Sequence, residues 1–76
     1  MIRYDEHAEF QLARRGIDKA WVEEAIRNPD TVETKRNRRL YLKCLPARHI
    51  MLLVVTPADD PDYVITAYFD RTRPCA

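Results

Sequence analysis

The spacing of the apolar residues changes once along the chain, near Thr31, and this change restricts the fold more than any other feature. Before it, apolar side chains recur at about every fourth position, as Tyr4, Ala8 and Leu12 do. Such a spacing places them on one face of a helix. After Thr31, apolar and polar residues alternate, which is typical of strands with one buried face. The sequence therefore predicts helices followed by strands, the order of an α+β domain.

Short signals mark the limits of the predicted helices. Gly16, the only glycine in the chain, suits the left-handed position just beyond a helix end. Asp18 is a natural N-cap for a second helix, and Asn28-Pro29 ends it. The second helix has an apolar face made of Trp21, Val22, Ala25 and Ile26. We predict an αα-hairpin that extends to Asn28.

The rest of the chain is predicted to form four strands, at residues 31–35, 39–45, 49–56 and 63–69. The short connections favour an antiparallel meander with the helices on one face. The predicted fold is therefore a mainly antiparallel ααββββ arrangement in two layers, and the 76 residues form one domain. The core residues expected between the helices and the sheet are Trp21, Val22, Ile26, Leu42, Leu52, Val54 and Ile65.

The positive charge is concentrated between residues 35 and 48. This stretch holds six basic residues and no acid, whereas residues 1–34 carry a net charge of −3 and residues 49–76 carry −2. A local positive field attracts polyanions even when the whole chain is near neutral. Basic residues also protect a sheet edge from pairing, so a solvated edge hairpin is the alternative. The predicted nucleic-acid-binding residues are Lys35, Arg36, Arg38, Arg39, Tyr41, Arg48 and Arg71.

Alternation along the strands sorts the side chains between the two faces of the predicted sheet. The side expected to face the helices carries Leu40, Leu42, Cys44, Ile65, Ala67 and Phe69. The uncovered side is then expected to carry Arg39, Tyr41, Lys43, Thr66 and Tyr68. Cations, phenols and a hydroxyl on an open sheet suit RNA, because they neutralise phosphates and stack on bases. The same residue types are also typical of a solvated surface, and alternation alone does not decide between the two.

His7 is the main candidate for proton transfer, because histidine titrates near neutral pH. It shares a polar helix face with Gln11 and Arg14, four and seven residues further on. RNA can be cleaved without a metal, since its 2′-hydroxyl attacks the adjacent phosphate and the protein only moves protons and stabilises charge. The plainer interpretation of His7 and Tyr68 is that both are ordinary surface residues.

The cysteines and the N-terminus are predicted to have no special role. Cys44 is expected to be a free thiol in a strand, and Cys75 lies next to the C-terminus, so no disulfide is predicted. Neither has His or Cys at metal-ligand spacing, and we expect neither a metal nor a cofactor. No apolar stretch is long enough for a signal peptide or a membrane span. The expected location is the reducing cytoplasm.

The order of several short motifs resembles a family of small bacterial domains of unknown function. The motifs are His7 in the first helix, Arg14-Arg15-Gly16-Ile17, Asn28-Pro29-Asp30, and the strand segments at residues 40–43, 51–55 and 64–68. The resemblance extends over residues 5–69. This family looks like a member of the barnase–EndoU–colicin–RelE group of folds, which includes the RelE, ParE and BrnT toxins of toxin–antitoxin pairs.

The resemblance implies metal-independent RNA cleavage, or an activity derived from it, and an antitoxin protein as partner. By position it implies catalytic roles for His7, Arg14, Lys43, Thr66 and Tyr68. The leading hypothesis is therefore an RNA-binding, ribonuclease-type toxin domain that acts as an endoribonuclease. The alternative is a non-catalytic interaction module that uses the basic hairpin of residues 35–48. A DNA-binding regulator is less favoured, because the second helix contains Glu23 and Glu24 and is not basic.

Overall fold

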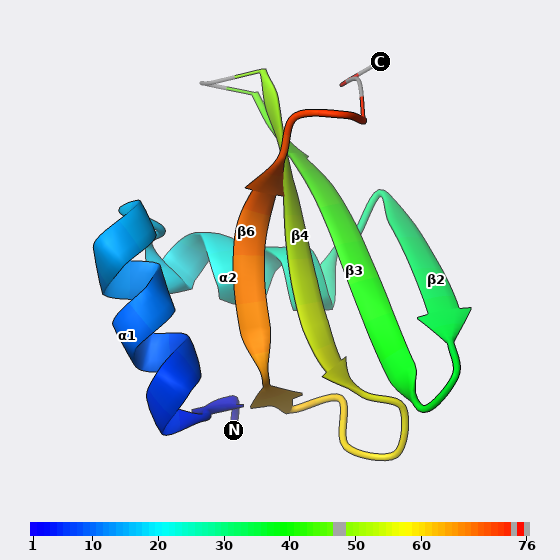
Figure 1. The fold of residues 1–76 in the computed structure, drawn as a ribbon. Coiled ribbons are helices and arrows are strands. Elements are labelled where there is room, and N and C mark those ends of the chain that lie inside the picture. The colour runs from blue at the N-terminus through cyan, green and yellow to red at the C-terminus, as the bar shows by residue number, and fades with distance from the viewer. Residues whose placement is uncertain (47–48, 74, 76) are drawn as a thin grey trace.

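The computed structural model describes residues 1–46, 49–73 and 75. Two helices and a four-stranded antiparallel sheet with the strand order β2-β3-β4-β6 form two layers. Helix α2 crosses behind β3 and β4, and α1 packs along β6 (Figure 1). The predicted α+β fold is confirmed. The elements are β1 (Arg3–Tyr4), α1 (Glu6–Arg15), α2 (Lys19–Arg27), β2 (Thr31–Lys35), β3 (Arg38–Leu45), β4 (Ile50–Pro57), β5 (Tyr63–Val64) and β6 (Thr66–Asp70).

The helix limits follow the capping signals. The Asp18 side chain accepts a hydrogen bond from the Ala20 N–H, and Asp5 caps α1 in the same way through the His7 N–H. Gly16 closes α1 with φ 68°, and its N–H bonds the Ala13 carbonyl. Only glycine adopts this conformation without strain. A short parallel pair of β1 with β5, which the sequence did not predict, ties the N-terminus to the second half of the chain.

A first apolar cluster fills the space between the helices and the sheet. Residues from α1 and α2 meet β4 and β6 there, and Val22, Leu52 and Val54 are fully buried. Trp21, Ile26 and Phe69 pack around it. Of the seven predicted core residues, Trp21, Val22, Ile26, Leu52 and Val54 are confirmed as members of this cluster.

The predicted alternation of β3 is wrong. Tyr41 pairs with Val54 and lies in the first cluster, 4% exposed, whereas Leu40 and Leu42 lie on the other side of the sheet. We call that side the far face. The segment Leu40-Tyr41-Leu42 is apolar at every position, so a period of two does not fix which face turns inward. The aromatic ring goes to the helices, and the two leucines go to the far face.

A second apolar cluster lies on the far face. Leu42, Leu53 and Val55 are buried in it, and Leu40, Met51 and Ile65 pack against them. Ile65 was predicted to face the helices, but it lies in this cluster. The strand is interrupted at Ile65, between the end of β5 and the start of β6, so the alternation does not continue through it. Beyond it, β6 alternates as predicted. Ala67 and Phe69 pack with the first cluster, and Thr66 and Tyr68 therefore belong to the opposite side of the strand.

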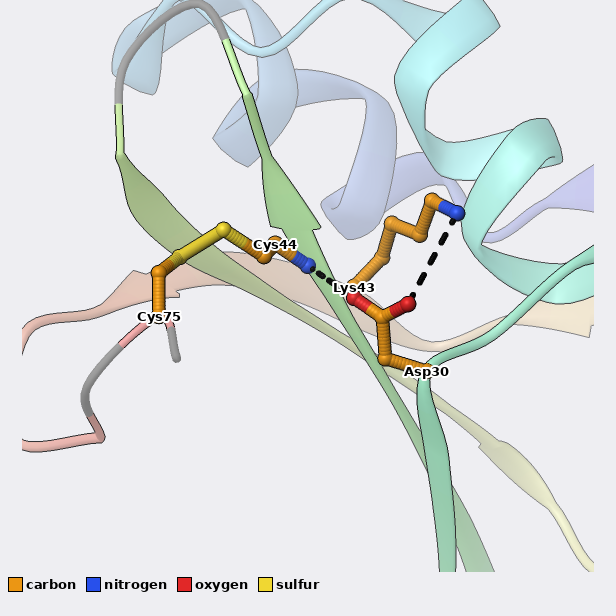
Figure 2. The surroundings of a disulfide bond; sticks show 4 residues. All are labelled: Asp30, Lys43, Cys44 and Cys75. Carbon is orange, nitrogen blue, oxygen red and sulfur yellow. Dashed lines mark hydrogen bonds and ion pairs between the residues drawn. A yellow bond between two sulfur atoms is a disulfide. The ribbon is translucent and has the colours of Figure 1, made fainter.

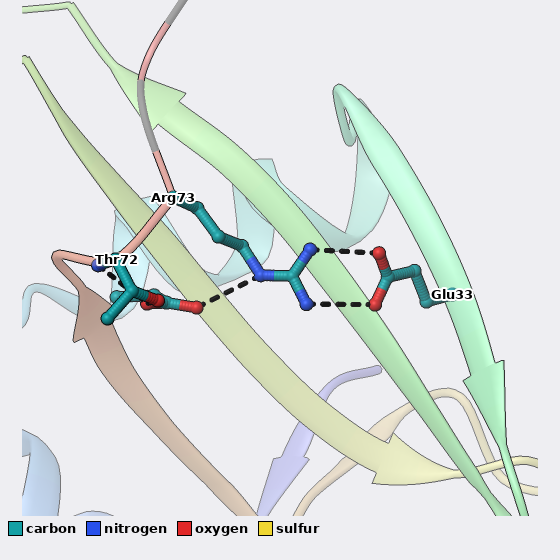
Figure 3. A network of polar contacts seen from close by, with 4 residues as sticks. Glu33, Thr72 and Arg73 are labelled. Carbon is teal, nitrogen blue, oxygen red and sulfur yellow. Dashed lines mark hydrogen bonds and ion pairs between the residues drawn. The ribbon is translucent and has the colours of Figure 1, made fainter.

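The far face is not uncovered as predicted, because the C-terminal segment returns across it. We call residues 71–73 together with Cys75 the C-terminal strap. Arg73 donates to Glu33 of β2 through both terminal nitrogens, at 2.9 and 3.1 Å, and to Asp70 of β6 at 3.0 Å (Figure 3). Since β2 and β6 are the two edge strands, its side chain crosses β3 and β4.

A disulfide joins Cys75 to Cys44 of β3, with a Cα–Cα distance of 5.5 Å (Figure 2). The prediction of free thiols is therefore wrong. Cys44 shares the side of β3 on which Leu42 lies, and the strap crosses that face after the last strand. The two cysteines, 31 positions apart in the sequence, meet because of the β3 alternation that was predicted the other way round.

Candidate nucleic-acid interface

The turn between β2 and β3 projects a group of cations. Lys35, Arg36 and Arg38 are exposed, and Arg39 is half-buried; these four residues are called the basic hairpin. Within the described residues none of the four forms an ion pair, whereas Arg3, Lys19, Arg27, Lys43 and Arg73 each have a carboxylate partner. The basic hairpin is thus a cluster of like charges without local neutralisation.

The turn itself holds one of these cations in an unfavourable backbone conformation. Lys35 pairs with Arg38, so Arg36 and Asn37 form a two-residue turn. Arg36 has φ 59°, in the left-handed region where a side chain is strained and where glycine is preferred in tight hairpins. A large basic side chain occupies a position at which glycine would be more stable.

The basic hairpin borders a hollow on the far face. Its volume is about 430 Å³, and Lys35, Arg36, Arg38, Leu40 and Val55 line it. Leu40 and Val55 are cross-strand partners and belong to the second apolar cluster. The hollow, called the hairpin pocket below, therefore has an apolar floor and a cationic rim.

A second polar group lies at the β6 edge of the same sheet. The Arg15 guanidinium donates to the Ala67 carbonyl at 2.9 Å and to the Thr66 hydroxyl at 3.5 Å. Its central carbon lies 6.0 Å from the centre of the Tyr68 ring, within the range of a cation–π contact. Arg15, Thr66 and Tyr68 are called the Arg15 group.

The Arg15 group and the hairpin pocket are connected by one row of residues. Thr66 is opposite Val55, and Val55 is opposite Leu40. At a strand spacing of about 4.8 Å, Thr66 and Leu40 are roughly 10 Å apart. A single extended polyanion could therefore contact both groups along the far face.

Arg14 was predicted to be a catalytic residue, whereas Arg15 was not. Arg15 lies three and seven positions after the buried residues Leu12 and Ala8, whereas Arg14 lies four and seven positions after the exposed residues Phe10 and His7. Residues three, four and seven positions apart share a helix face. The signal that Arg15 turns toward the sheet was therefore present in the helical spacing.

His7 lies away from the Arg15 group. It is exposed in the first turn of α1, where its Nε2 is 3.2 Å from the Gln11 Nε2. It lines a shallow hollow with Asp5, Glu6 and Phe10. Eight residues of helix separate it from Arg15, which corresponds to roughly 12 Å along the axis.

Lys43 and Tyr41 lie on the opposite side of the sheet from Thr66 and Tyr68. The Lys43 ammonium is 3.9 Å from an Asp30 carboxylate oxygen and points toward the helix layer (Figure 2). Asp30 also accepts the Cys44 N–H at 2.8 Å. Tyr41 is buried among the helices, and Arg39 and Lys43 share its side of β3, so the predicted position of these three residues on the open face is wrong. The five predicted catalytic residues thus occupy separate places, and among them only Thr66 and Tyr68 share one group.

The other predicted binding residues have different positions. Arg71 is exposed in the turn after β6, at the start of the C-terminal strap. Arg48 lies outside the described residues. The exposed basic surface of the far face therefore comes from the hairpin and the strap.

Hydrogen bonds shift the pKa of two carboxyl groups at the ends of the fold. The hydrogen bond from the Tyr63 hydroxyl, 2.7 Å long, is the main cause that lowers the pKa of Asp5. Hydrogen bonds from Thr72, and then from Arg73, lower the pKa of Asp70. Both carboxylates support structure: Asp5 caps α1, and Asp70 holds the strap. Among the described residues no three His, Cys, Asp or Glu side chains gather as metal ligands.

A family model described as "Domain of unknown function (DUF4258)" matches residues 4–69. No curated protein and no solved structure matches the chain. The matched range includes α1, the basic hairpin and all of β6 except Asp70, and it ends before the C-terminal strap. No helix in the described ranges is both long and apolar enough to cross a bilayer.

Proposed function

The chain belongs to the DUF4258 family, and since that family has no known function, we propose from the surface of the chain itself that it binds RNA through the basic hairpin. The bound strand would run along the far face from the hairpin pocket to the Arg15 group. Phosphates would contact Lys35, Arg36 and Arg38, and bases would contact the apolar floor and the Tyr68 ring.

The observation that carries this proposal is that four cations gather at one turn, and that among residues 1–46, 49–73 and 75 none of them has a carboxylate partner. Like charges held together repel one another and attract a polyanion. Five other cations of this chain have such partners. The left-handed backbone of Arg36 supports the same proposal, because strain of this kind persists where a side chain serves a function.

The proposal is tested by measuring the affinity for a fluorescent single-stranded RNA over a range of salt concentrations. The variant changes Lys35, Arg36 and Arg38 to Gln. If the three cations contact phosphates, the affinity falls at least tenfold, and the slope of log affinity against log salt becomes shallower by roughly 2.

The matched control changes Arg3, Lys19 and Arg27 to Gln, which removes the same charge from residues outside the hairpin. It should bind like the parent. Equal losses in both variants would mean that only the net charge matters. Undiminished binding by the hairpin variant would contradict the proposal, and a parent that binds an acidic protein but no RNA would support the interaction module instead.

A second candidate function is cleavage of the bound RNA, as the likeness to RelE and BrnT toxins implies, with an antitoxin as partner. The observation that favours it is the Arg15 group, in which one guanidinium donates to the Thr66 hydroxyl and lies 6.0 Å from the centre of the Tyr68 ring. In this proposal the RNA 2′-hydroxyl loses its proton to solvent and its oxygen forms a bond to phosphorus, while the bond from phosphorus to the 5′-oxygen breaks. Arg15 would stabilise the phosphate charge, and Tyr68 would give a proton to the leaving 5′-oxygen.

Cleavage is tested by incubating RNA with the protein in the presence of a chelator and identifying the ends formed. The expected product carries a 2′,3′-cyclic phosphate. Tyr68→Phe and Arg15→Gln should each slow its formation by roughly 10²–10⁴-fold, while His7→Ala and Arg14→Gln should leave the rate unchanged because of their positions. A large loss of cleavage rate in His7→Ala alone would instead support the catalytic role that the family resemblance implies for His7. Intact RNA with the parent protein would leave RNA binding without catalysis.

A further inference from the structure

We propose that the hairpin pocket takes one unpaired base, so that the protein selects single-stranded over double-stranded RNA. This inference rests on the proposed RNA binding and adds the class of RNA. The pocket has an apolar floor of Leu40 and Val55 beneath a rim of three cations, a combination that suits a flat apolar base with phosphates on either side.

The volume and position of the pocket support this assignment. About 430 Å³ is within the range of pockets that hold small organic groups. In a duplex the bases are stacked and paired, and only an unstacked base can enter such a hollow. The Tyr68 ring, 38% exposed, lies two strands away on the same face and offers a stacking surface for a further base.

The test compares one RNA sequence as a single strand, the same strand annealed to its complement, and inorganic polyphosphate. We expect the parent to bind the single strand at least tenfold more tightly than the other two. Leu40→Ala removes the pocket floor and should abolish most of this preference, while its affinity for polyphosphate stays unchanged.

Met51→Ala is the matched control, because Met51 packs in the same apolar cluster and does not line the pocket. It should keep the preference for single strands. Equal affinity of the parent for single strand and duplex would overturn the inference and leave the proposed RNA binding standing. Failure to bind any RNA would instead contradict the proposed function.

A second inference concerns the other half of the far face and rests on separate observations. We infer that the Cys44–Cys75 disulfide fastens the C-terminal strap over this face and that its reduction releases the strap. Leu42 and Leu53 are only 2% and 1% exposed, although both helices pack on the opposite side of the sheet. The Arg73 side chain of the strap crosses β3 and β4 on that face (Figure 3), between Asp70 and Glu33, and we infer that the strap covers the two leucines.

The polar contacts of the strap are partly exposed to solvent. The Arg73 side chain is 40% exposed and its partner Glu33 is 39% exposed, while Asp70 is 13% exposed, and solvent screens exposed ion pairs. The covalent link through Cys75 therefore holds the segment in place. A dithiol reductant would break the S–S bond by transferring two electrons. Each cysteine sulfur then takes a proton, and the reductant forms its own disulfide.

Release of the strap would enlarge the RNA interface. The far-face leucines would become accessible to bases. Arg73 would leave Glu33 and bind a phosphate instead, and exposed Arg71 could bind a second phosphate beside it. We expect the reduced protein to bind single-stranded RNA about 3–10-fold more tightly than the oxidised protein. The slope against salt should steepen by roughly 0.7 for each added phosphate contact.

The test measures RNA affinity and hydrogen exchange of β3 and β4 for the oxidised protein, the reduced protein and Cys75→Ser. The reduced protein and Cys75→Ser should behave alike, with faster exchange at Leu42 and Leu53 and tighter binding. Arg73→Gln in the Cys75→Ser background should lose the added affinity. Two alkylatable thiols in protein prepared without a reductant would show that the disulfide does not form and would overturn the inference. Equal hydrogen exchange in both redox states would overturn it as well.

Hydrogen exchange also separates this inference from the proposed function. Faster exchange on reduction with no RNA binding in either state would leave the strap release standing and contradict RNA binding. Equal affinity in both states, with the strap released, would mean that the covered face takes no part in the interface.

Discussion

The two faces of the sheet are both apolar at their centres, but different kinds of structure cover them. On the helix side, α1 and α2 pack apolar side chains over Leu52 and Val54. On the far face, a short strap held by a disulfide and ion pairs crosses the strands that carry Leu42 and Leu53. The packing of the helices is an integral part of the core, whereas we expect reduction of the disulfide to release the strap. The comparison leads us to expect that the helix side contributes more to stability, and it is the far face that we propose as the binding side.

Truncation of the two matched leucines in β4 is expected to give the largest difference in stability between the two faces. Leu52 and Leu53 are neighbours that point to opposite faces and are both almost fully buried. Leu52→Ala should lower the free energy of unfolding by ~2–5 kcal/mol. Leu53→Ala should cost about half as much, because the strap can settle into the space. Urea denaturation measures both, and an equal or larger loss for Leu53→Ala would break the comparison.

Removing the disulfide is the next largest change. Cys75→Ser should lower the free energy of unfolding by ~2–4 kcal/mol, chiefly because the unfolded chain gains freedom when the cross-link is lost. The native circular dichroism spectrum should be unchanged, since the helix-side core does not involve Cys75. Cys44→Ser is the control and should give the same loss. Different losses for the two variants would indicate that one cysteine has a role outside the disulfide.

Arg36→Gly separates binding from stability within the basic hairpin. Glycine tolerates the φ of 59° that Arg36 adopts, so the free energy of unfolding should rise by up to about 1 kcal/mol. RNA affinity should fall because one cation is lost. Thermal unfolding and RNA titration of the same preparation measure the two effects. A loss of stability would show that the arginine side chain has a structural role in the turn.

On the far face, a smaller change in stability is expected at acid pH, where Asp70 becomes protonated. Hydrogen bonds from Thr72 and Arg73 lower the pKa of Asp70 from 3.8. Its contribution is complete well above 3.8 and is lost as pH falls through the lowered pKa of the folded state. Asp70→Asn should therefore flatten the acid side of the stability profile. An unchanged profile would mean that the Asp70 contacts do not persist in solution.

Tyr4 gives the corresponding effect on the helix side, at alkaline pH. Burial, together with its contact to Glu23, raises its pKa from 10.0 to about 12. Stability from this group is complete below pH 10.0 and is lost as pH rises toward 12. Tyr4→Phe should remove that loss in an alkaline unfolding titration. The two faces would then lose stability at opposite ends of the pH scale.

The parts of the fold that local rules control were predictable from the sequence. Gly16 and Asp18 ended and began the helices as expected, and Ala67 and Phe69 alternated as expected in β6. The alternation of β3 was not predictable in this way, because Leu40, Tyr41 and Leu42 are all apolar and either face could be buried. The side of β3 that faces the helices also decides two other features. It places Cys44 where it meets Cys75, and it places Lys43 on the helix side.

The candidate site was predictable where it depends on charge. The basic hairpin is evident from the sequence, but the hairpin pocket required the pairing of Leu40 with Val55 across two strands. The catalytic residues implied by resemblance were separated by the same β3 alternation and by the length of α1. Arg15, in contrast, was accessible to sequence reasoning through its spacing from Ala8 and Leu12.

The most direct test of the proposed RNA interface is to map where the RNA contacts the protein. Isotope-labelled protein is titrated with a single-stranded RNA, and the backbone amide signals are followed by NMR. We expect shifts concentrated at Lys35, Arg36, Arg38, Leu40 and Val55, which extend to Thr66, with little change on α2. Shifts concentrated on α2 or around His7, with the hairpin signals unmoved, would contradict it.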